Sequence, residues 1–361
     1  MKALVVNALG AGFELESVDI ATPIGREVLI DVKASGLCHT DLLFATHSVV
    51  PLPAVLGHEV SGIVAELGPD VTQFKVGDHV VGCLTQTCGT CARCQSGRSF
   101  QCQHPEATVR RPAERPRLSR NGVSLFQGLG LGGFAERALI HENQLALLPN
   151  DMPFAQAALL GCGVITGAGA VINTANVQAG DTVVIFGAGG VGLNAVSGAR
   201  IAGASRIVVI DIRPARLQAA QHFGATDIID STKNDPVEAV RTFLPRGADH
   251  VFDFVGMKAV AEQGLSMLAL GGGLYLVGVS EPEVGIDLNI FNTIGGQRRV
   301  QGVNIGSTNF KRDIPMYANL YLQGRLNLDE LVSKRIDLRD VNDGYAALRE
   351  GAINRVVVTS F

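Results

Sequence analysis

The chain has 361 residues, of which 47% are hydrophobic and 18% charged, so it is large enough for two globular domains. The formal net charge is −4 at pH 7, which excludes a broadly basic surface, and we expect no nucleic-acid or membrane partner. The longest apolar tract, residues 155–172, contains four glycines together with Gln156 and Cys162. These residues favour a buried segment over a membrane span.

The pattern of apolar residues changes along the chain. The first 150 residues predict a mostly β domain, because short strand-like runs broken by Gly and Pro occur at 4–9, 27–36, 61–68 and 78–84. Apolar strands then alternate with helical stretches, the strands being expected at 182–186, 206–211, 226–230, 249–256, 273–279 and 298–304. This alternation indicates an α/β fold with a doubly wound parallel (Rossmann) sheet. We predict that this domain, 164–304, is inserted in a mostly β domain made of 1–163 and 305–361.

Six of the seven cysteines fall into two groups, each typical of a zinc site. Cys88, Cys91, Cys94 and Cys102 have the spacing C-x2-C-x2-C-x7-C, which suits a closed tetrahedral structural zinc in a lobe at about 83–105. Clustered cysteines in a secreted chain would instead suggest disulfides. The first residues, MKALVVNALG, lack the apolar core of a signal peptide, so we expect zinc and a cytoplasmic location.

The second group is dispersed along the sequence. Cys38, His58 and Cys162 supply two thiolates and one imidazole, which leave a fourth position open, as a catalytic zinc requires. The sequence therefore predicts two Zn²⁺ ions per subunit. Cys83 is left over and is expected to be a small core residue.

A glycine-rich turn follows the strand at 182–186 directly. Gly187, Gly189 and Gly192 stand at G-x-G-x-x-G spacing, with Gly190 and Val191 between them, and a helical stretch follows. Such glycines let the backbone approach a pyrophosphate, which the amides of the helix N-terminus then bind. The turn predicts a dinucleotide site.

The residue that ends the next strand bears on the choice of cofactor. Asp211 lies 19 residues past Gly192, where a carboxylate binds the ribose hydroxyls of NAD. It would repel the 2′-phosphate of NADP by roughly 1–4 kcal/mol per unit charge at about 4 Å. Ile212 adds no compensating charge, whereas Arg213 and Arg216 either supply one, bracket the adenosine or face solvent; Ile212 and Arg216 are predicted to contact the cofactor. We therefore expect NAD.

These motifs, taken in order, resemble the zinc-dependent alcohol dehydrogenases of the medium-chain dehydrogenase/reductase superfamily. The resemblance runs nearly end to end, through GLCHTD, LGHEVSGIVAELG, VTQFKVGDHVV, CGTCARC, LLGCGVITG, GAGGVG and INRVVVTSF. It implies that the β domain is GroES-like and that Cys38, His58 and Cys162 are the catalytic zinc ligands, with Glu59 beside the metal. It also implies that Asp41 orients His58 and that Thr40 contacts the substrate oxygen.

The same resemblance implies further cofactor contacts. His39 and Arg355 match positions that contact the pyrophosphate, and Thr166 and Val279 match positions that line the nicotinamide. Relatives of this length form homodimers or homotetramers, usually by continuing the sheet of the nucleotide domain, so 273–279 and 298–304 are candidates for such an edge.

One departure from the family pattern concerns proton release. Many such enzymes have a His five residues after the first zinc-ligand Cys, but this chain has Leu43 there, as aryl and allylic alcohol dehydrogenases do. His47 is a possible substitute. We predict oxidation of primary aromatic, allylic or medium-chain alcohols to aldehydes. A thiol-adduct (glutathione- or mycothiol-dependent formaldehyde) dehydrogenase and a non-catalytic superfamily member stay open as alternatives.

Overall fold

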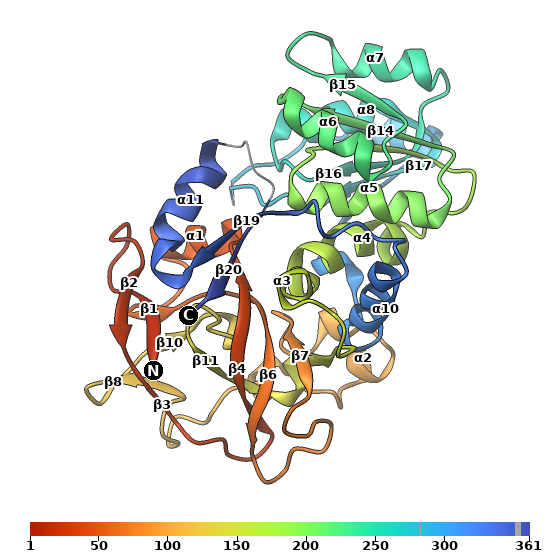
Figure 1. Cartoon of the computed structure of the whole chain (residues 1–361). Helices are drawn as coiled ribbons and strands as arrows, with labels where there is room; N and C mark the ends of the chain where they lie inside the picture. The colour runs from red at the N-terminus through yellow and green to blue at the C-terminus, as the bar shows by residue number, and fades with distance from the viewer. Residues whose placement is uncertain (282, 351–354) are drawn as a thin grey trace. The chain divides into compact units, whose positions relative to one another are not determined.

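The chain folds into two compact units, each with its own sheets (Figure 1). The computed structural model describes residues 1–281, 283–350 and 355–361. The first unit is Met1–Cys162 together with Asn309–Phe361, and the second is Gly163–Thr308. The second unit is therefore an insertion in the sequence of the first.

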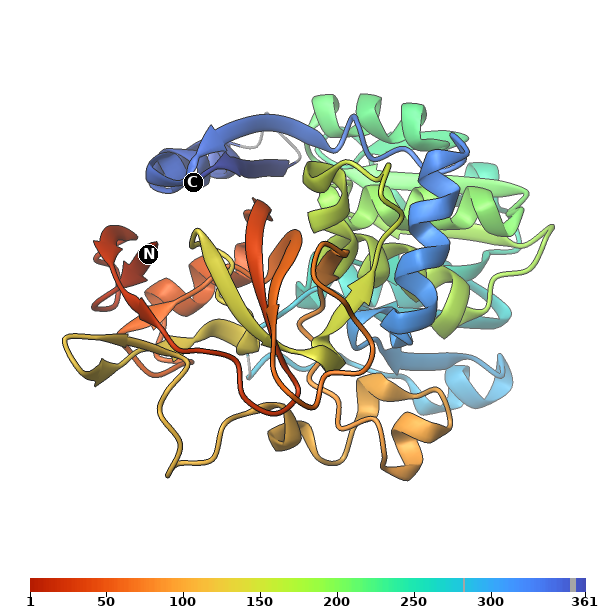
Figure 2. The same ribbon diagram turned by 60° about the horizontal axis from the view of Figure 1, so that its bottom comes forward.

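The first unit is built mainly from antiparallel strands. Its largest sheet has the order β12-β7-β6-β4-β20-β19, with β11 also paired to β4. Figure 2 shows the red to yellow strands of this sheet side by side. The strands are β4 (Glu27–Gly36), β6 (Glu59–Leu67), β7 (His79–Gly82), β11 (Arg137–His141), β12 (Leu145–Leu147), β19 (Val332–Asp337) and β20 (Arg355–Ser360). β4 matches the predicted strand 27–36 and pairs with β6 over most of its length, so the ends of β4 and β6 next to the zinc-ligand residues lie side by side.

Two smaller sheets and several short helices complete the first unit. One sheet has the order β10-β5-β1-β2 and the other β3-β8-β9. Their strands are β1 (Lys2–Val6), β2 (Glu14–Ser17), β3 (Asp19–Ile20), β5 (Ala54–Val55), β8 (Leu118–Arg120), β9 (Val123–Ser124) and β10 (Phe126–Gln127). The helices are α1 (His39–Thr46), α2 (Ala92–Gln95), α10 (Phe310–Leu322) and α11 (Val341–Glu350), with 3₁₀ turns η1 (Ser99–Gln101), η2 (Pro105–Thr108), η3 (Gly128–Gly130), η4 (Glu142–Gln144) and η8 (Leu338–Asp340).

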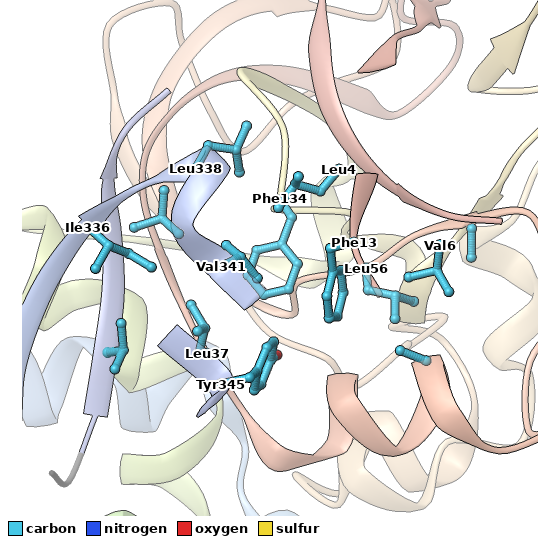
Figure 3. Packing of buried hydrophobic residues seen from close by; sticks show 14 residues of the cluster. Leu4, Val6, Phe13, Leu37, Leu56, Phe134, Ile336, Leu338, Val341 and Tyr345 are labelled. Carbon is cyan, nitrogen blue, oxygen red and sulfur yellow. The ribbon is translucent and has the colours of Figure 1, made fainter. Parts of the chain in front are cut away.

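An apolar core of the first unit, whose packing is shown in Figure 3, includes residues next to the zinc-ligand positions in the sequence. Leu37 precedes Cys38, and Leu56 lies two residues before His58; both leucines are fully buried. They pack in one cluster with Phe134, with residues of β1, and with Tyr345 of α11. Because a core of this kind is close-packed, it fixes the backbone on which the ligand side chains stand.

The second unit is the predicted parallel sheet. In its described residues, 163–281 and 283–308, the strands pair in the order β15-β14-β13-β16-β17-β18, and every pairing is parallel. This is the doubly wound order in which the first strand lies at the centre. The strands are β13 (Thr182–Phe186), β14 (Arg206–Asp211), β15 (Asp227–Asp230), β16 (Ala248–Asp253), β17 (Leu268–Leu276) and β18 (Arg299–Gly302). The helices are α5 (Gly190–Ala202), α6 (Pro214–Phe223), α7 (Pro236–Phe243), α8 (Lys258–Met267) and α9 (Ile290–Gly295), with the turn η7 (Ile305–Ser307).

One continuous helical stretch, Phe154–Ala175, contains the apolar tract noted in the sequence. It consists of α3 (Phe154–Leu159), the π-helical segment η5 (Leu160–Val164), α4 (Ile165–Gly169) and the π-helical segment η6 (Ala170–Ala175). Length and composition would allow it to cross a membrane, but 89% of its apolar window is buried inside the structure. A buried core helix passes the same test, so the stretch is weak evidence for a membrane span.

Candidate zinc and dinucleotide sites

Four side chains of the first unit form a buried cluster of possible metal ligands. Cys38 follows β4 and stands at the N-cap of α1, His58 precedes β6, and Glu59 is its first residue. Cys162 comes from η5, where π-helical bonding widens the turn, as it often does at functional sites. One ligand atom from each of the four lies within 4.8 Å of the others. The structure thus brings together residues that are up to 124 positions apart in sequence (162 − 38).

The imidazole of His58 is held by a buried carboxylate. Asp41 Oδ2 lies 2.9 Å from His58 Nδ1, and Asp41 Oδ1 accepts a hydrogen bond from the backbone N–H of Gly57 at 2.9 Å. Gly57 has φ +92°, a conformation that favours glycine, and this turn brings its N–H to Asp41. Asp41 thereby leaves Nε2 as the ring nitrogen for a metal, as ligand-orienting carboxylates do.

Glu59 is fully buried, and in the described residues neither of its carboxylate oxygens has a hydrogen bond. The guanidinium of Arg355 is nearby, with Nη2 3.4 Å from Glu59 Oε1 and Nη1 donating to the carbonyl of Leu37 at 3.3 Å. Burial raises the pKa of Glu59 to about 7, although the charge of Arg355 opposes this shift. A Cβ added at Gly36 would lie 2.3 Å from Glu59 Oε2, so the close approach of these two strands requires glycine there.

The electrostatics of the cluster favour a thiolate. A hydrogen bond from the Cys162 thiol, followed by the charge of His58, holds the pKa of Cys38 well below its usual range against the effect of burial. The hydrogen bond to Cys38, together with burial and the charge of the Cys38 thiolate, raises the pKa of the Cys162 thiol. Burial disfavours the charged form of His58, but Asp41 and Cys38 outweigh it and raise the pKa of the imidazole.

These donors fit a zinc ion. Zinc takes thiolate sulfur at about 2.3 Å and imidazole nitrogen at about 2.0–2.1 Å, and three such ligands with an open fourth position are typical of catalytic sites. Glu59, whose carboxyl oxygens have no hydrogen bond in the described residues, adds a buried acidic group that a bound cation would hold in its ionised form. The residues present therefore suit the metal that the sequence predicted.

Cys88, Cys91, Cys94 and Cys102 form the second cluster, with their sulfur atoms within 4.8 Å of one another. They lie around α2 and η1. The backbone N–H groups of Thr90 and Cys91 donate to Cys88 Sγ at 3.4 and 3.3 Å. Burial is the largest single effect and raises the pKa of Cys88, but these bonds and the side-chain hydrogen bonds of Thr90 and Cys102 together outweigh it and lower the pKa to about 6. Four converging sulfurs form the closed donor set of a structural zinc.

The glycine-rich turn lies between β13 and α5, as expected. Gly187 has φ +90°, and a Cβ added at Gly192 would lie 1.9 Å from the carbonyl oxygen of Gly187, so neither position tolerates a side chain. A Cβ at Gly189 would meet nothing within 4 Å, which leaves open space where the backbone could approach a phosphate. Gly190 and Val191 form the first residues of α5, whose amides are placed to bind an anion.

Asp211 ends β14 and is 6% exposed. Its Oδ2 accepts the backbone N–H of Ala188 at 2.8 Å, and its Oδ1 accepts that of Arg213 at 2.9 Å. Arg216 Nη1 lies 3.9 Å from Oδ2, and Ile212 is 62% exposed. The carboxylate is thus fixed beside the glycine-rich turn by backbone donors on both sides.

The remaining predicted site residues lie at α1, on α4 and in the segment after β17. His39 is exposed and Thr40 partly buried, both in the first turn of α1. Thr166 is partly buried on α4, and Val279 is 78% exposed after β17. Leu43 is partly buried in α1, and His47 Nδ1 at its C-terminus lies 2.9 Å from Thr46 Oγ1.

Sequence reasoning missed residues that support the ligands without a motif of their own. Tyr345 on α11 donates its hydroxyl to the carbonyl oxygen of Cys38 at 3.1 Å. Gly36 makes room for Glu59, and the backbone N–H of Gly57 donates to Asp41. Only the glycines carried a signal, because they are conformationally permissive residues at the start of GLCHTD and GHE. Cys83 is fully buried, and burial raises the pKa of its thiol to about 11, as expected of a core cysteine.

An inserted Rossmann unit with a Cys₂His cluster and a Cys₄ cluster defines a zinc-binding dehydrogenase. Two family models match the chain: "Alcohol dehydrogenase GroES-like domain" over residues 25–150 and "Zinc-binding dehydrogenase" over residues 190–320. The first match lies within the first unit, and the second covers most of the second unit and continues to residue 320 of the first.

Similar proteins cover the whole chain. S-(hydroxymethyl)glutathione dehydrogenase of Synechocystis sp. is 35% identical over 99% of this chain and 99% of its own length. The structure of benzyl alcohol dehydrogenase from Acinetobacter calcoaceticus is 34% identical, with a TM-score of 0.94 over 100% of this chain and 99% of that one. A zinc-binding dehydrogenase from Sinorhizobium meliloti 1021, bound to NADP, is 27% identical with a TM-score of 0.84 over 99% and 98% of the two chains.

The chain therefore belongs to the zinc-dependent alcohol dehydrogenase family and is an oxidoreductase that uses zinc and a nicotinamide cofactor.

Proposed function

We propose that this enzyme oxidises primary aromatic, allylic or medium-chain alcohols with NAD. A hydride passes from the alcohol carbon to the nicotinamide and the hydroxyl proton is released, so alcohol and NAD⁺ give aldehyde, NADH and H⁺. The observation that carries the proposal is the buried cluster of Cys38, His58 and Cys162, with Asp41 on the imidazole. When bound there, zinc supplies Lewis acidity, which lowers the pKa of an oxygen ligand.

The side chains of this site have distinct proposed roles. Cys38, His58 and Cys162 hold the metal, and Glu59 adds negative charge beside it. We propose that the hydroxyl of Thr40, two residues past Cys38 in the first turn of α1, contacts the substrate oxygen and begins removal of its proton. For the cofactor, we propose that His39 and Arg355 contact the pyrophosphate, that Thr166 and Val279 line the nicotinamide, and that Ile212 and Arg216 flank the adenosine.

Two substitutions test the assignment of the metals. Cys162→Ala should remove one zinc and nearly all turnover while leaving the fold intact. Cys94→Ala should reduce stability first, because a structural zinc contributes directly to folding. Elemental analysis that found fewer than two zincs per chain in fully active enzyme would overturn the assignment.

Asp211 supports the preference for NAD over NADP. Its carboxylate is held by the amides of Ala188 and Arg213 beside the glycine-rich turn, where it can accept ribose hydroxyls and would repel a 2′-phosphate. The S. meliloti structure is bound to NADP, so under this proposal the two relatives differ in cofactor preference. Catalytic efficiencies with the two cofactors at one pH decide the matter, and equal values would refute the preference.

Leu43 supports the preference for bulky unsaturated alcohols. It is partly buried in α1, five residues after Cys38, and we infer that its apolar side chain excludes water from the approach of the substrate. Burial of a further 100 Å² of a benzyl-sized group would contribute about 2.5 kcal/mol, which ethanol cannot gain. The measurement is kcat/KM for benzyl or cinnamyl alcohol against ethanol at one pH, and an equal or higher value for ethanol would refute the preference.

A thiol-adduct dehydrogenase is the second candidate, because S-(hydroxymethyl)glutathione dehydrogenases are 35–36% identical to this chain over 99% of its length. Comparison of S-hydroxymethylglutathione with plain alcohols separates the two functions. A clear excess of activity with the adduct would favour the second candidate.

We also propose that the enzyme is a cytoplasmic homodimer or homotetramer. Seven unpaired thiols suit a reducing compartment. β18 ends the described order of the second unit's sheet, and α9 next to it in sequence exposes Ile290, Phe291 and Ile294 by 70–84%. An unpaired strand edge with exposed apolar side chains is a surface that a second copy would cover. Light scattering of the purified protein tests this, and a monomer would refute it.

A further inference from the structure

Asp253 is a buried acidic residue at the carboxyl end of the parallel sheet in the second unit, and its side chain is 2% exposed. It ends β16 and is the strand partner of Phe186, the last residue of β13, after which the glycine-rich turn begins. Because β14 lies on one side of β13 and β16 on the other, the order of the strands reverses between β13 and β16. Ligands of doubly wound sheets bind outside the carboxyl ends of the strands at this point. Asp253 therefore stands where the sheet is expected to bind its cofactor.

One carboxylate oxygen of Asp253 holds the loop that follows β16. Its Oδ1 accepts the backbone N–H of Val255 at 2.7 Å and that of Gly256 at 3.1 Å. Burial raises the pKa of Asp253, and these two bonds oppose the shift because they favour the charged form. The cost of burying this carboxylate is thus offset in part by two backbone amides of a single loop.

The backbone carbonyl of Asp253 holds a second loop, the one that follows β17. It accepts the N–H groups of Val277 and Gly278, both at 2.9 Å. The two loops also pack backbone against backbone. A Cβ added at Gly256 would lie 2.7 Å from the carbonyl oxygen of Val279, and one added at Gly278 would overlap the backbone nitrogen of Gly256. Asp253 therefore fixes the path of both loops, and the second of them leads to Val279.

The loop after β16 lies between two positions that the proposed function assigns to the cofactor. On one side, a Cβ added at Gly187 of the glycine-rich turn would lie 3.1 Å from Val255 Cγ2. On the other side, Gly256 packs against the backbone of Val279, the residue proposed to line the nicotinamide. Val255 is 40% exposed and Val279 is 78% exposed, so both are accessible to a ligand. The loop thus links the pyrophosphate end of the cofactor site with its nicotinamide end.

We propose that Asp253 is a positioning residue for the nicotinamide half of the cofactor: its carboxylate holds the loop 254–256, and that loop holds the segment 277–279 in the conformation that accepts the ring. The inference rests on the proposed use of NAD and adds a residue to which the proposed function gives no role. Asp253 acts through backbone amides and takes no part in hydride transfer itself. If the loops were free to take several conformations, the cofactor would bind more weakly, in proportion to the fraction of molecules in the competent one.

The test compares two ligands that differ at the nicotinamide. NADH has the ring and ADP-ribose lacks it, whereas both carry the adenosine and the pyrophosphate. Calorimetry on the zinc-loaded protein gives the dissociation constant of each. For Asp253→Ala we expect NADH to bind about tenfold more weakly, with the competent conformation populated to about one tenth, and ADP-ribose to bind within about twofold of the unmodified protein. Asp253→Asn keeps an acceptor oxygen for both amides and should retain most of the NADH affinity.

Asp235 provides a matched control in the same unit. Its Oδ1 accepts the N–H groups of Val237 and Glu238 at 2.8 and 3.0 Å, two and three residues on, as Asp253 Oδ1 does for its own loop. It caps α7, which follows β15, and β14 and β13 lie between β15 and β16. Asp235→Ala should lower the thermal midpoint through the lost cap but leave the ratio of the two dissociation constants unchanged. A change in that ratio is therefore not a consequence of reduced stability alone.

The binding measurement needs no alcohol, so it separates failure of this inference from failure of the proposed function. If no alcohol is oxidised but Asp253→Ala still weakens NADH and not ADP-ribose, the positioning role stands and the proposed function fails. If Asp253→Ala weakens both ligands equally or neither, or if Asp253→Asn loses as much NADH affinity as Asp253→Ala, the positioning role is refuted. Should Asp253→Ala not fold, Asp253→Ser takes its place, because its hydroxyl is a weaker acceptor in such turns and should give the same selective loss to a smaller extent.

Discussion

Asn143 connects the Cys₄ lobe to the large sheet of the first unit, and its removal should release the structural zinc. The side chain is 5% exposed, and its Nδ2 donates to the carbonyls of Thr87 and Cys88, both at 3.0 Å. Its Oδ1 accepts Arg26 Nη2 at 3.0 Å. Cys88 is therefore held from its backbone by a residue outside the lobe.

The magnitude follows from these contacts. Asn143→Ala removes two donors from two carbonyl groups and an acceptor from Arg26, and each lost bond or unpaired buried group costs about 1–3 kcal/mol. With partial compensation by water, we expect about 2–4 kcal/mol. If most of this acts on the lobe, zinc affinity of the Cys₄ site falls by roughly 30- to 1,000-fold.

The assay is the rate of zinc release to a chromogenic chelator, followed together with the thermal midpoint. Asn143→Asp keeps the acceptor for Arg26 and loses the Nδ2 donors, so it should release zinc nearly as fast as the alanine variant. Asn234→Ala, at an exposed position, is the control and should behave like the unmodified protein. Release from Asn143→Ala at the control rate, with an unchanged midpoint, would refute the anchoring role.

Three further predictions concern the second unit and the pH dependence of stability. Gly192→Ala should destabilise the protein by about 1–3 kcal/mol, because the added Cβ would lie 1.9 Å from the carbonyl oxygen of Gly187, whereas Gly189→Ala, with open space around it, should keep the thermal midpoint; equal midpoints would contradict this. Asp211→Gly should weaken NAD use and narrow the gap to NADP in steady-state kinetics, and an unchanged ratio of efficiencies would count against the ribose contact. Burial lowers the pKa of His141 from 6.5 to about 4, so the unfolded chain binds a proton that the native state does not as pH falls from about 6.5 to 4. The free energy of unfolding should therefore decrease over this window and be constant above it for this group, and urea midpoints at pH 7 and 5 should differ less for His141→Asn than for the unmodified protein.

Much of the fold was predictable because its signals are local. The strand at 27–36 was expected at the residues that form β4, and the glycine-rich turn was placed between a strand and a helix from its spacing alone. Period-2 runs and glycine spacing depend on neighbours in sequence, so they can be seen without the fold. The zinc ligands were predictable for another reason, since few other roles suit cysteines at such spacing.

What the sequence did not predict depends on contacts between distant segments. α11 carries no motif, yet its Tyr345 binds the carbonyl of Cys38, 307 residues away. The stretch 110–120 is rich in arginine and contains two prolines, a pattern typical of a solvated loop, yet the side chains of Arg110 and Arg117 are only 8% exposed. The buried partner of Arg110 and Arg117, Glu27, is more than 80 residues distant, and no local pattern indicates that pairing.

The contact between Tyr345 and Cys38 also has a consequence for synthesis on the ribosome. All four members of the buried ligand cluster have been translated by residue 162, yet β20 pairs with β4 and Tyr345 reaches Cys38 only after about 350 residues have emerged. A nascent chain thus has the thiols of its catalytic site for most of the time of translation without the strand and helix that fix them. The ribosome adds about 5–20 residues per second, so translation from residue 162 to residue 361 takes roughly 10–40 s. During that interval the inserted parallel sheet can fold as a unit, and the contacts that fix the ligand cluster of the first unit are completed last.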